Sequence, residues 1–248
     1  MADSNSRICY FFIMDVSRFN HGDTFKNYYN MVPAYRRDKI DALKPASAKN
    51  LSLGVGVLLE EAKNRLGLKD DELSSVEDVE REAPFYYNLS HSGQRALCAL
   101  SDVRIGCDVE KIETDEARAE SKMSISGRFF SEGEARRIKE SFNIEGGLSE
   151  LEKRARMETA AEGFYRYWTL KESVIKVTGQ GLAMPLDSFE VDISGSGIGL
   201  KEIGDWPGLH DIDLGRCRLY VPYTEEEYAY GLCIASPEEY SIELEIVG

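Results

Sequence analysis

The hydrophobic pattern is clearest between residues 164 and 182, FYRYWTLKESVIKVTGQGL. Large apolar side chains recur there at i, i+4 and i+11, which predicts one buried face of a helix: Phe164, Trp168 and Ile175. Lys171 falls on the same row, and we expect its stem to lie along the edge of that face. Glu172 and Lys176 share a neighbouring face, one turn apart. Taken alone, these two residues indicate only an ion pair on a helix surface, worth about 0.2–0.5 kcal/mol.

Hydrophobic periodicity and turn residues predict further elements on both sides of this helix. Helices are expected over residues 33–43, 51–66 and 116–128, and from Ser131 onward. Ser131 and Glu134 have the spacing of a capping box. Strands are expected over residues 8–14, 85–90, 96–101, 105–110, 189–193, 217–221, 228–235 and 242–247. The acidic stretch 70–82 indicates a surface loop or a short helix. The polar, acidic stretch 142–162 indicates a helix with a loop at residues 146–147, which leads into the helix at 164–182.

A weak repeat relates the two halves of the chain. The run LCALS at residues 97–101 is similar to LCIAS at residues 232–236, an offset of 135 residues. At the same offset two acidic pairs align: Asp108 with Glu243, and Glu110 with Glu245. The repeat predicts an α/β fold with two similar halves, residues 1–116 and 117–248, each ending in a hairpin-like pair of strands.

Composition indicates a globular protein. The 248 residues are 42% hydrophobic and 30% charged, and they contain no apolar run long enough to span a membrane. The N-terminal run ICYFFIMD ends in an acidic residue, which favours a first strand over a signal peptide. The five cysteines include no C-x-x-C pair, so reduced thiols in the cytoplasm are the simplest expectation.

The charge distribution limits the classes of ligand. A net charge of −14 argues against general nucleic-acid binding. Basic residues nevertheless gather in three clusters, at residues 36–49, 128–139 and 153–156. Helix surfaces often carry such charges without a binding role, but three clusters on an acidic chain leave room for a phosphorylated ligand and an acidic partner.

The strand at residues 105–110 carries two carboxylates, Asp108 and Glu110, at i and i+2. On a strand this spacing places both on one face, roughly 6.6 Å apart, while Cys107 and Val109 face the core. Such a pair can chelate one hard cation that also binds phosphate oxygens, as Mg²⁺ does. With 44 acidic residues, roughly eight acid-x-acid pairs arise by chance, so the spacing alone proves nothing. The position of this pair in an apolar strand is better evidence of a binding role, because burying an unpaired carboxylate is energetically costly.

A second unusual run is NLSHSG at residues 88–93, which ends a strand. Its hydroxyls and the His91 imidazole suit a phosphate monoester. A solvated histidine in a turn is the plain alternative. A serine nucleophile with a histidine base is a third interpretation, but Ser90 and His91 are adjacent and would point to opposite faces of a strand.

These motifs occur in one order together with others. The series is NLSHSG (88–93), IGCDVEK (105–111), RFFSEGE (128–134), WTLKESVIK (168–176), GQGL (179–182) and PLDSF (185–189). It resembles the 4′-phosphopantetheinyl transferases, in particular the long type that activates surfactin synthetase. The resemblance implies an α+β (α/β) fold of two similar subdomains related by pseudo-twofold symmetry, with the active site in the cleft between them.

The resemblance also implies a metal site and catalytic residues. Asp108, Glu110 and Glu172 would bind Mg²⁺, or Mn²⁺ in its place. Glu172 would in addition be the general base for the acceptor serine, and Lys176 would reach the phosphates. Asp108, Glu172 and Lys176 are therefore the expected catalytic residues.

The co-substrate implied by the resemblance is coenzyme A. Ser90 and His91 would contact its 3′-phosphate, and Lys176 would contact its diphosphate. Arg36 and Lys39 would lie near the same ligand.

The implied reaction is the Mg²⁺-dependent transfer of 4′-phosphopantetheine from coenzyme A to a serine of an apo acyl or peptidyl carrier protein, releasing adenosine 3′,5′-bisphosphate. The acidic carrier would dock on the basic run 128–139, beside Phe129 and Phe130. We expect a cytoplasmic monomer that binds neither nucleic acid nor membrane. Two alternatives stay open: another Mg²⁺-dependent phosphate-ester enzyme that acts on coenzyme A or nucleotides, and a catalytically silent module that binds carrier proteins.

The chain departs from the family pattern at two places. A G-K-P motif usually precedes the serine-histidine run and holds the adenine end of coenzyme A, whereas this chain has REAP at residues 81–84. An arginine often found before the second N-terminal helix is also missing, and Lys49 is the substitute that the sequence offers. Both differences concern affinity for coenzyme A more than the type of reaction.

Overall fold

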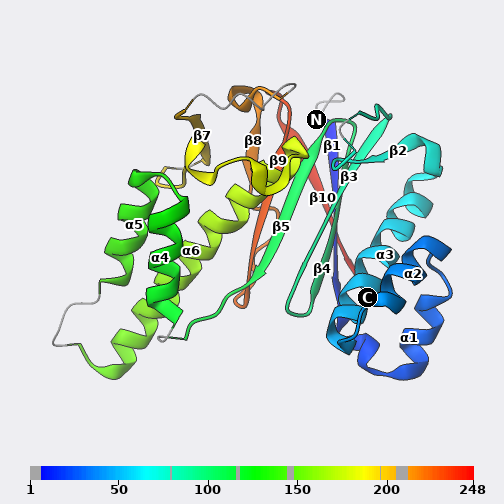
Figure 1. Ribbon diagram of the computed structural model, residues 1–248, viewed down its shortest axis with the longest axis horizontal. Coiled ribbons are helices and arrows are strands. Elements are labelled where there is room, and N and C mark those ends of the chain that lie inside the picture. Colours follow the sequence, from blue (N-terminus) through cyan, green and yellow to red (C-terminus); the bar gives the residue numbers. More distant parts are fainter. Residues whose placement is uncertain (1–6, 79, 116–117, 144–147, 196, 205–211) are drawn as a thin grey trace, which may run out of the picture.

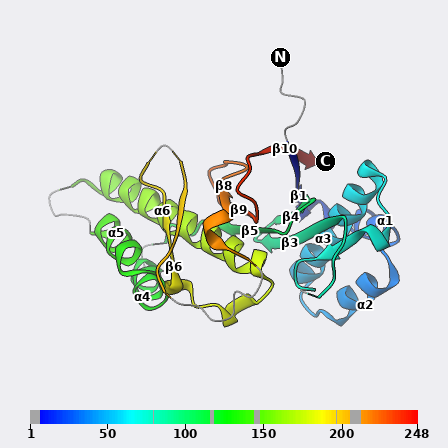
Figure 2. The same ribbon diagram turned by 90° about the horizontal axis from the view of Figure 1, so that it is seen from above.

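The computed structural model describes residues 7–78, 80–115, 118–143, 148–195, 197–204 and 212–248. The helices form two groups: α1 (Gly22–Tyr29), α2 (Ala34–Ala42) and α3 (Ala46–Leu66), and α4 (Ala119–Phe129), α5 (Glu132–Phe142) and α6 (Glu150–Thr178). Figure 1 shows the two groups on opposite sides of a central layer of strands. Figure 2 shows the same separation from above. In the described parts of the chain, no helix is long and apolar enough to cross a membrane.

The first sheet packs against the N-terminal helices. Its strands are β1 (Arg7–Asp15), β2 (Leu73–Ser75), β3 (Phe85–Ser92), β4 (Arg95–Ser101) and β10 (Tyr240–Val247), in the order β10-β1-β4-β3-β2. Strand β1 pairs parallel with β10 and antiparallel with β4. Its side chains alternate between two cores, with Phe12 and Met14 in the core shared with α3 and with Phe11 and Ile13 in the core shared with the second sheet. Burial on both faces explains why this strand is apolar throughout.

Helix α3 packs closely on β4 because Gly54 has no side chain. A Cβ at this position would overlap the side chains of Val16 and Ala96. The helix ends at Gly67, which adopts the left-handed conformation with a φ of 66°. Glycine is favoured there because other residues pay a steric penalty in this region.

The second sheet carries the C-terminal helices. Its strands are β5 (Ile105–Lys111), β9 (Tyr228–Ile234) and β8 (Arg218–Tyr220), in that order. Helix α6 crosses β5 and β9 at two glycines, Gly106 and Gly231. A Cβ on either would overlap a backbone carbonyl of α6, that of Ser173 or of Thr169. The two glycines therefore let the helix backbone rest directly on the sheet.

The remaining elements are short. A two-stranded sheet is formed by β6 (Phe189–Asp192) and β7 (Gly199–Glu202). Short 3₁₀ helices are η1 (Val16–Asn20), η2 (Asp70–Glu72), η4 (Gly181–Ala183), η5 (Leu186–Ser188) and η6 (Leu214–Arg216).

Most predicted elements are confirmed, with ends shifted by a few residues. The structure adds α1, β2 and β7, which the hydrophobic pattern did not predict. The predicted loop at residues 146–147 and the start of the helix predicted over 116–128 lie outside the described residues. The mixed α/β architecture is confirmed. The pseudo-twofold symmetry and the boundary at residue 116 stay predictions.

The two halves of the sequence exchange strands. Strand β5 precedes the predicted boundary but pairs with β9 in the second sheet, and β10 follows the boundary but pairs with β1 in the first. Neither half of the sequence therefore forms its sheet alone.

Lys171 is fully buried, so the prediction that its stem lies along an edge was wrong. Its ammonium donates to both carboxylate oxygens of Glu134, at 2.8 and 2.7 Å, and to the carbonyl oxygen of Phe189 at 2.7 Å. Glu134 also accepts bonds from the backbone N–H groups of Ser131 and Val191. The capping box is confirmed, and the same glutamate joins α5 to α6 and β6. Every donor and acceptor of this pair has a partner, which is the condition for burying charge.

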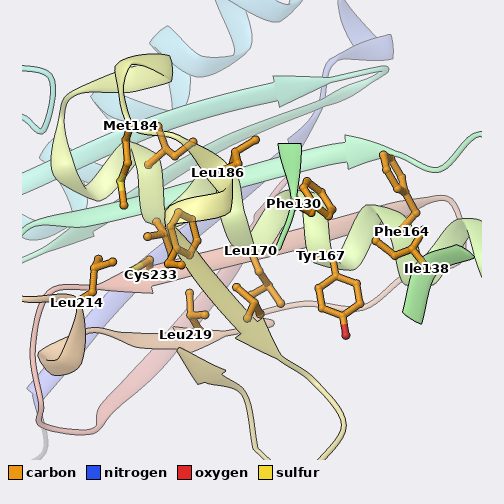
Figure 3. Close-up of a cluster of buried hydrophobic side chains, with 14 of the residues drawn as sticks. Phe130, Ile138, Phe164, Tyr167, Leu170, Met184, Leu186, Leu214, Leu219 and Cys233 are labelled. Atoms are coloured by element: carbon orange, nitrogen blue, oxygen red, sulfur yellow. The ribbon is translucent and has the colours of Figure 1, made fainter. Parts of the chain in front are cut away.

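Apolar side chains surround this ion pair. Figure 3 shows the cluster of which they form part, with Phe130 and Phe164 near one another and Leu170 below them. The rings of Phe130 and Phe164 stack at a centroid distance of 6.0 Å. The ammonium of Lys171 lies over the ring of Phe189, 4.2 Å from its centroid. The charge is thus held in apolar, aromatic surroundings without access to water.

Lys171→Met should lower the free energy of unfolding by about 3–5 kcal/mol, because it leaves the Glu134 carboxylate buried without its cation. Urea denaturation measures the change. The control is Arg154→Ala, which breaks the exposed pair of Arg154 and Glu158 on the same helix and should cost less than about 1 kcal/mol. Wild-type stability in Lys171→Met would contradict the role assigned to the pair.

Candidate active site

A pocket of about 830 Å³ lies where β3, β5 and α6 meet. Its polar lining residues are Ser90, His91, Asp108, Glu110, Glu172 and Lys176. Its apolar lining residues are Leu89, Phe129, Trp168, Met184, Pro185 and Leu186. Six predicted site residues from three separate segments therefore share one pocket, whereas Arg36 and Lys39 are not among its lining residues.

The pocket lies over a seam between the two sheets. Strands β3 and β5 contact each other but belong to different sheets, and no backbone ladder joins them in the described chain. Side chains bridge the seam instead. Asn88 Oδ1 accepts a bond from the N–H of Cys107 at 2.8 Å, and Ser92 Oγ accepts one from the N–H of Lys111 at 3.1 Å.

Each of the two carboxylates on β5, Asp108 and Glu110, accepts a hydrogen bond from a serine hydroxyl of β3. Ser90 Oγ donates to Asp108 Oδ1 at 2.8 Å, and Ser92 Oγ donates to Glu110 Oε2 at 2.7 Å. The two serines are two residues apart on one strand, and so are the two carboxylates. The alternation of a strand therefore places both pairs on the same face, as the spacing of Asp108 and Glu110 predicts.

Lys176 reaches this face from α6. Its ammonium donates to Asp108 Oδ1 at 2.7 Å, to Ser90 Oγ at 3.0 Å and to the carbonyl oxygen of Cys107 at 3.1 Å. Burial alone would lower the pKa of Lys176, but the attraction of Asp108 outweighs it and the pKa is raised. Lys176 is therefore a cation in the pocket, bonded to Asp108 rather than to Glu172.

The pocket concentrates negative charge. Burial raises the pKa of Glu172 to about 7, and the carboxylate of Asp108 adds to this effect while Lys176 opposes it. The pKa of Glu110 is also raised, first by burial and then by Asp108, and its bond from Ser92 works in the other direction. One lysine does not neutralise three carboxylates. A carboxyl group with a pKa near 7 can exchange a proton at neutral pH.

The donor set fits a hard divalent cation. Asp108 Oδ2 is buried and accepts no hydrogen bond from any residue that the structure describes. Carboxylate oxygens are the ligands that Mg²⁺ and Mn²⁺ prefer. The described residues include no close group of three or more His, Cys, Asp or Glu side chains, so the three carboxylates are not gathered into a cage. Their assignment as metal ligands stays a prediction.

Arg36 and His91 lie near enough to interact. His91 is exposed at the pocket rim, and the partial desolvation of its imidazole lowers its pKa, an effect to which the positive charges of Lys176 and Arg36 add. The stem of Arg36 packs against Gly56 of α3, and its Nε is buried without a hydrogen-bond partner among the described residues. Lys39 is exposed one turn further along α2. The structure thus places Arg36 beside the predicted phosphate contact and leaves Lys39 on the surface.

Most of the pocket residues lie in a region that matches a known protein family. The sequence model described as "4′-phosphopantetheinyl transferase superfamily" matches residues 104–233, which include Asp108, Glu110, Glu172 and Lys176. The chain belongs to this superfamily. Ser90, His91, Arg36 and Lys39 precede the matched region.

Individual members of the superfamily are similar over part of their length. The 4′-phosphopantetheinyl transferase Sfp of Bacillus subtilis (strain 168) is 31% identical over 153 residues, 62% of this chain and 56% of the relative. The 4′-phosphopantetheinyl transferase psf-1 of Bacillus pumilus is 32% identical over 160 residues, 64% of this chain and 57% of the relative. The L-aminoadipate-semialdehyde dehydrogenase-phosphopantetheinyl transferase of Mus musculus is 34% identical over 112 residues, 44% of this chain and 32% of the relative. The chain spans little more than half the length of the bacterial relatives.

One detail of the predicted docking surface of this superfamily member was wrong. Phe130 is buried, and Arg137 is bonded to Glu190 and Tyr167. Phe130 therefore cannot contact a partner, whereas the Arg137 side chain is 33% exposed although it is bonded within the protein. Phe129 is 42% exposed and lines the pocket, so it is the aromatic residue of this run that a partner can reach.

Sequence reasoning missed Ser92, although it belongs to the NLSHSG run. The available signal was its spacing from Ser90, which equals the spacing of Asp108 and Glu110. In the REAP run, which replaces the usual G-K-P motif of the superfamily, the Arg81 side chain does not line the pocket. Arg81 donates instead to the carbonyl oxygens of Asp70 and Asp71.

The shifted pKa of Glu172 predicts how stability depends on pH. Between its ordinary pKa of 4.5 and its folded value of about 7, Glu172 is protonated in the folded protein and ionised in the unfolded protein. Its contribution is therefore increasingly destabilising as pH rises through this window. Without metal, Glu172→Gln should match the wild type at pH 5 and exceed its stability at pH 8 by on the order of 1–3 kcal/mol.

Urea denaturation with EDTA at both pH values measures this difference. Glu162→Gln removes an exposed carboxylate of the same helix and should show no such change between pH 5 and pH 8. An equal effect of Glu172→Gln at the two pH values would show that the Glu172 carboxyl is not shifted.

Proposed function

We propose that this chain transfers the 4′-phosphopantetheine group of coenzyme A to a serine of an apo acyl or peptidyl carrier protein. The serine oxygen attacks the β-phosphorus of coenzyme A and forms the new P–O bond. The bond from that phosphorus to the bridging diphosphate oxygen breaks, and adenosine 3′,5′-bisphosphate leaves. The serine proton passes to a base of the protein.

One observation carries the proposal: three carboxylates, a half-buried lysine and a serine-histidine pair line a single pocket with an extensive apolar wall. The polar groups suit a diphosphate and a proton transfer. The apolar wall suits an organic group attached to that phosphate. Membership of the superfamily selects phosphopantetheine transfer among the reactions that such a pocket could support.

The residues have separate roles in this reaction. Glu172 accepts the serine proton, a role that its pKa of about 7 suits. Lys176 leaves its bond to Asp108 and neutralises charge on the leaving diphosphate oxygen. Asp108, Glu110 and Glu172 would hold Mg²⁺, or Mn²⁺, and that cation would neutralise phosphate charge when bound.

Recognition of coenzyme A completes the site. Ser90 and His91 bind the 3′-phosphate, and Arg36 supplies positive charge from α2. Lys39 extends this charge at the surface of the same helix. Positive charge and hydroxyl donors are the groups that bind a phosphate monoester.

The carrier protein would approach over α4 and α5. Phe129 is exposed at the pocket, and Arg128 lies against its ring at 5.1 Å from the centroid. Arg136 and Lys139 are exposed on α5. These cations give a local attraction for an acidic partner on a chain whose net charge is −14. We expect the enzyme to act as a monomer. We also expect it in the cytoplasm, where thiols stay reduced, and its five cysteines are buried and free.

The decisive assay incubates the protein with Mg²⁺, coenzyme A and an apo carrier protein and then determines the intact mass of the carrier. We expect the carrier to gain one phosphopantetheine group. Glu172→Gln should lower kcat by roughly 10²–10⁴-fold, because it removes the general base. Glu162→Gln is the control on the same helix and should retain wild-type kcat.

Two results would exclude the proposal. Hydrolysis of coenzyme A with an unmodified carrier would instead support a phosphate-ester hydrolase. Binding of the carrier without any change in its mass, tested with both acyl and peptidyl carriers, would support a catalytically silent module.

Arg36→Ala should weaken the binding of coenzyme A by roughly 10–100-fold, because it removes a charge beside the 3′-phosphate site. Lys39→Ala should have a smaller effect in the same direction, because Lys39 is exposed at the surface. Calorimetric titration measures the dissociation constants. Neither variant should change affinity for 3′-dephospho-coenzyme A, which lacks that phosphate. Lys44→Ala, an exposed lysine beyond the end of α2, should bind both ligands like the wild type. Equal losses for the two ligands would place Arg36 and Lys39 away from the 3′-phosphate.

A further inference from the structure

Ser92 connects the seam between the sheets to one carboxylate of the pocket. Its hydroxyl accepts a bond from the N–H of Lys111 at 3.1 Å and donates to Glu110 Oε2 at 2.7 Å. We propose that Ser92 is a positioning residue, whose hydroxyl holds the Glu110 carboxylate in the orientation that receives the divalent cation. The inference rests on the proposed function, because it takes the cation site from that proposal.

The two hydrogen bonds of the Ser92 hydroxyl fix its proton in the direction of Glu110. A serine hydroxyl has a single O–H. Because a backbone N–H already points at one lone pair of Ser92, its O–H is left for Glu110. The Glu110 carboxylate is then held by one oxygen. Its other oxygen, Oε1, accepts no hydrogen bond from the described residues and is left for a ligand.

The position of Ser92 is itself constrained. Gly93 follows it with a φ of 58° and turns the chain from β3 into β4. The next N–H, that of Gln94, donates to the hydroxyl of Tyr228 on β9 at 2.9 Å. A Cβ at Gly93 would contact the same tyrosine hydroxyl. The turn is therefore held against the second sheet, and Ser92 is held with it.

The hydrogen bonds of Ser92 to its carboxylate differ from those of Ser90. The hydroxyl of Ser90 shares Asp108 with the ammonium group of Lys176, which also donates to Ser90. The environment of Asp108 can therefore change when Lys176 moves to a ligand. Glu110 has no such lysine in its hydrogen bonds, and its orientation depends on a serine anchored to the main chain of its own strand. Groups that orient a metal-binding carboxylate in this way contribute to metal affinity.

The test compares Ser92→Thr with Ser92→Val, two side chains of the same shape that differ in the hydroxyl. Binding of Mn²⁺ is titrated by electron paramagnetic resonance, with and without coenzyme A. We expect Ser92→Val to weaken Mn²⁺ binding about 10–100-fold, and Ser92→Thr to stay within about threefold of the wild type. The free energy of unfolding is measured for each variant by urea denaturation.

The variant Asn88→Ala distinguishes the orientation of Glu110 from a general weakening of the contact between β3 and β5. It removes the side-chain bond to Cys107 N–H but contacts neither carboxylate. We expect lower stability in this variant with Mn²⁺ affinity within about threefold of the wild type. An equal loss of Mn²⁺ affinity in Asn88→Ala and Ser92→Val would assign the effect to the seam and overturn the inference.

Two further results would also overturn it: wild-type Mn²⁺ affinity in Ser92→Val, or no Mn²⁺ binding by the wild-type protein. None of these measurements requires a carrier protein. Loss of Mn²⁺ affinity in Ser92→Val would support the inference even if no carrier were modified, so its failure and that of the transfer reaction are distinguishable.

Discussion

The buried ion pair of Lys171 and Glu134 fixes the rotation of helix α6. Successive residues of an α-helix are about 100° apart, so a lysine held on one side determines where the next residue points. Here that residue is Glu172, which lines the pocket. The contacts at Gly106 and Gly231 set how closely the helix lies on the second sheet. One ionic contact and two missing side chains thus place the face of α6 that carries Glu172 and Lys176 over β5.

The pocket that results is electrostatically unbalanced in the absence of ligands. Asp108, Glu110 and Glu172 face a single lysine, and the pKa of Glu172 rises to about 7 because it is buried beside other carboxylates. Lys176 offsets part of this charge by bonding Asp108. A divalent cation would take over that task, and its binding would release the proton held by Glu172. Lys176 would then be available for phosphate, so metal binding and phosphate binding support each other.

The sheets explain why the pocket forms where it does. A continuous ladder between β3 and β5 would occupy backbone groups at this position, but the two strands are joined by Asn88 and Ser92 instead. Polar side chains are therefore needed at the seam for structural reasons. One of the two, Ser92, also donates to the Glu110 carboxylate. At that residue a structural contact of the seam and a contact of the pocket come from one side chain.

Much of this arrangement could be predicted from local sequence. The strand that carries Asp108 and Glu110 and the helix that carries Glu172 and Lys176 both follow from hydrophobic period, and the order of motifs joins them in one site. Contacts between distant segments could not be predicted in this way. The helical row through Lys171 predicts a position at the edge of the buried face, but neither its full burial nor its partner, because the capping box already accounts for Glu134.

Other features lacked a local signal. Strand β10 pairs with β1 across more than two hundred residues, and nothing in either strand specifies that neighbour. Helix α1 has only eight residues and no fully buried residue, so its sequence offers too few positions to establish a helical period. Ser92 has a role only because β5 lies beside β3, which is a property of the assembled sheets.

A crystal structure with Mn²⁺ and coenzyme A tests the central claim most directly, because the anomalous scattering of Mn²⁺ locates the metal without reference to activity. The account predicts a single strong peak within coordination distance of the Asp108, Glu110 and Glu172 carboxylates, with Lys176 displaced from Asp108 onto a diphosphate oxygen. Mn²⁺ located elsewhere, with Lys176 still bonded to Asp108 beside bound coenzyme A, would contradict it.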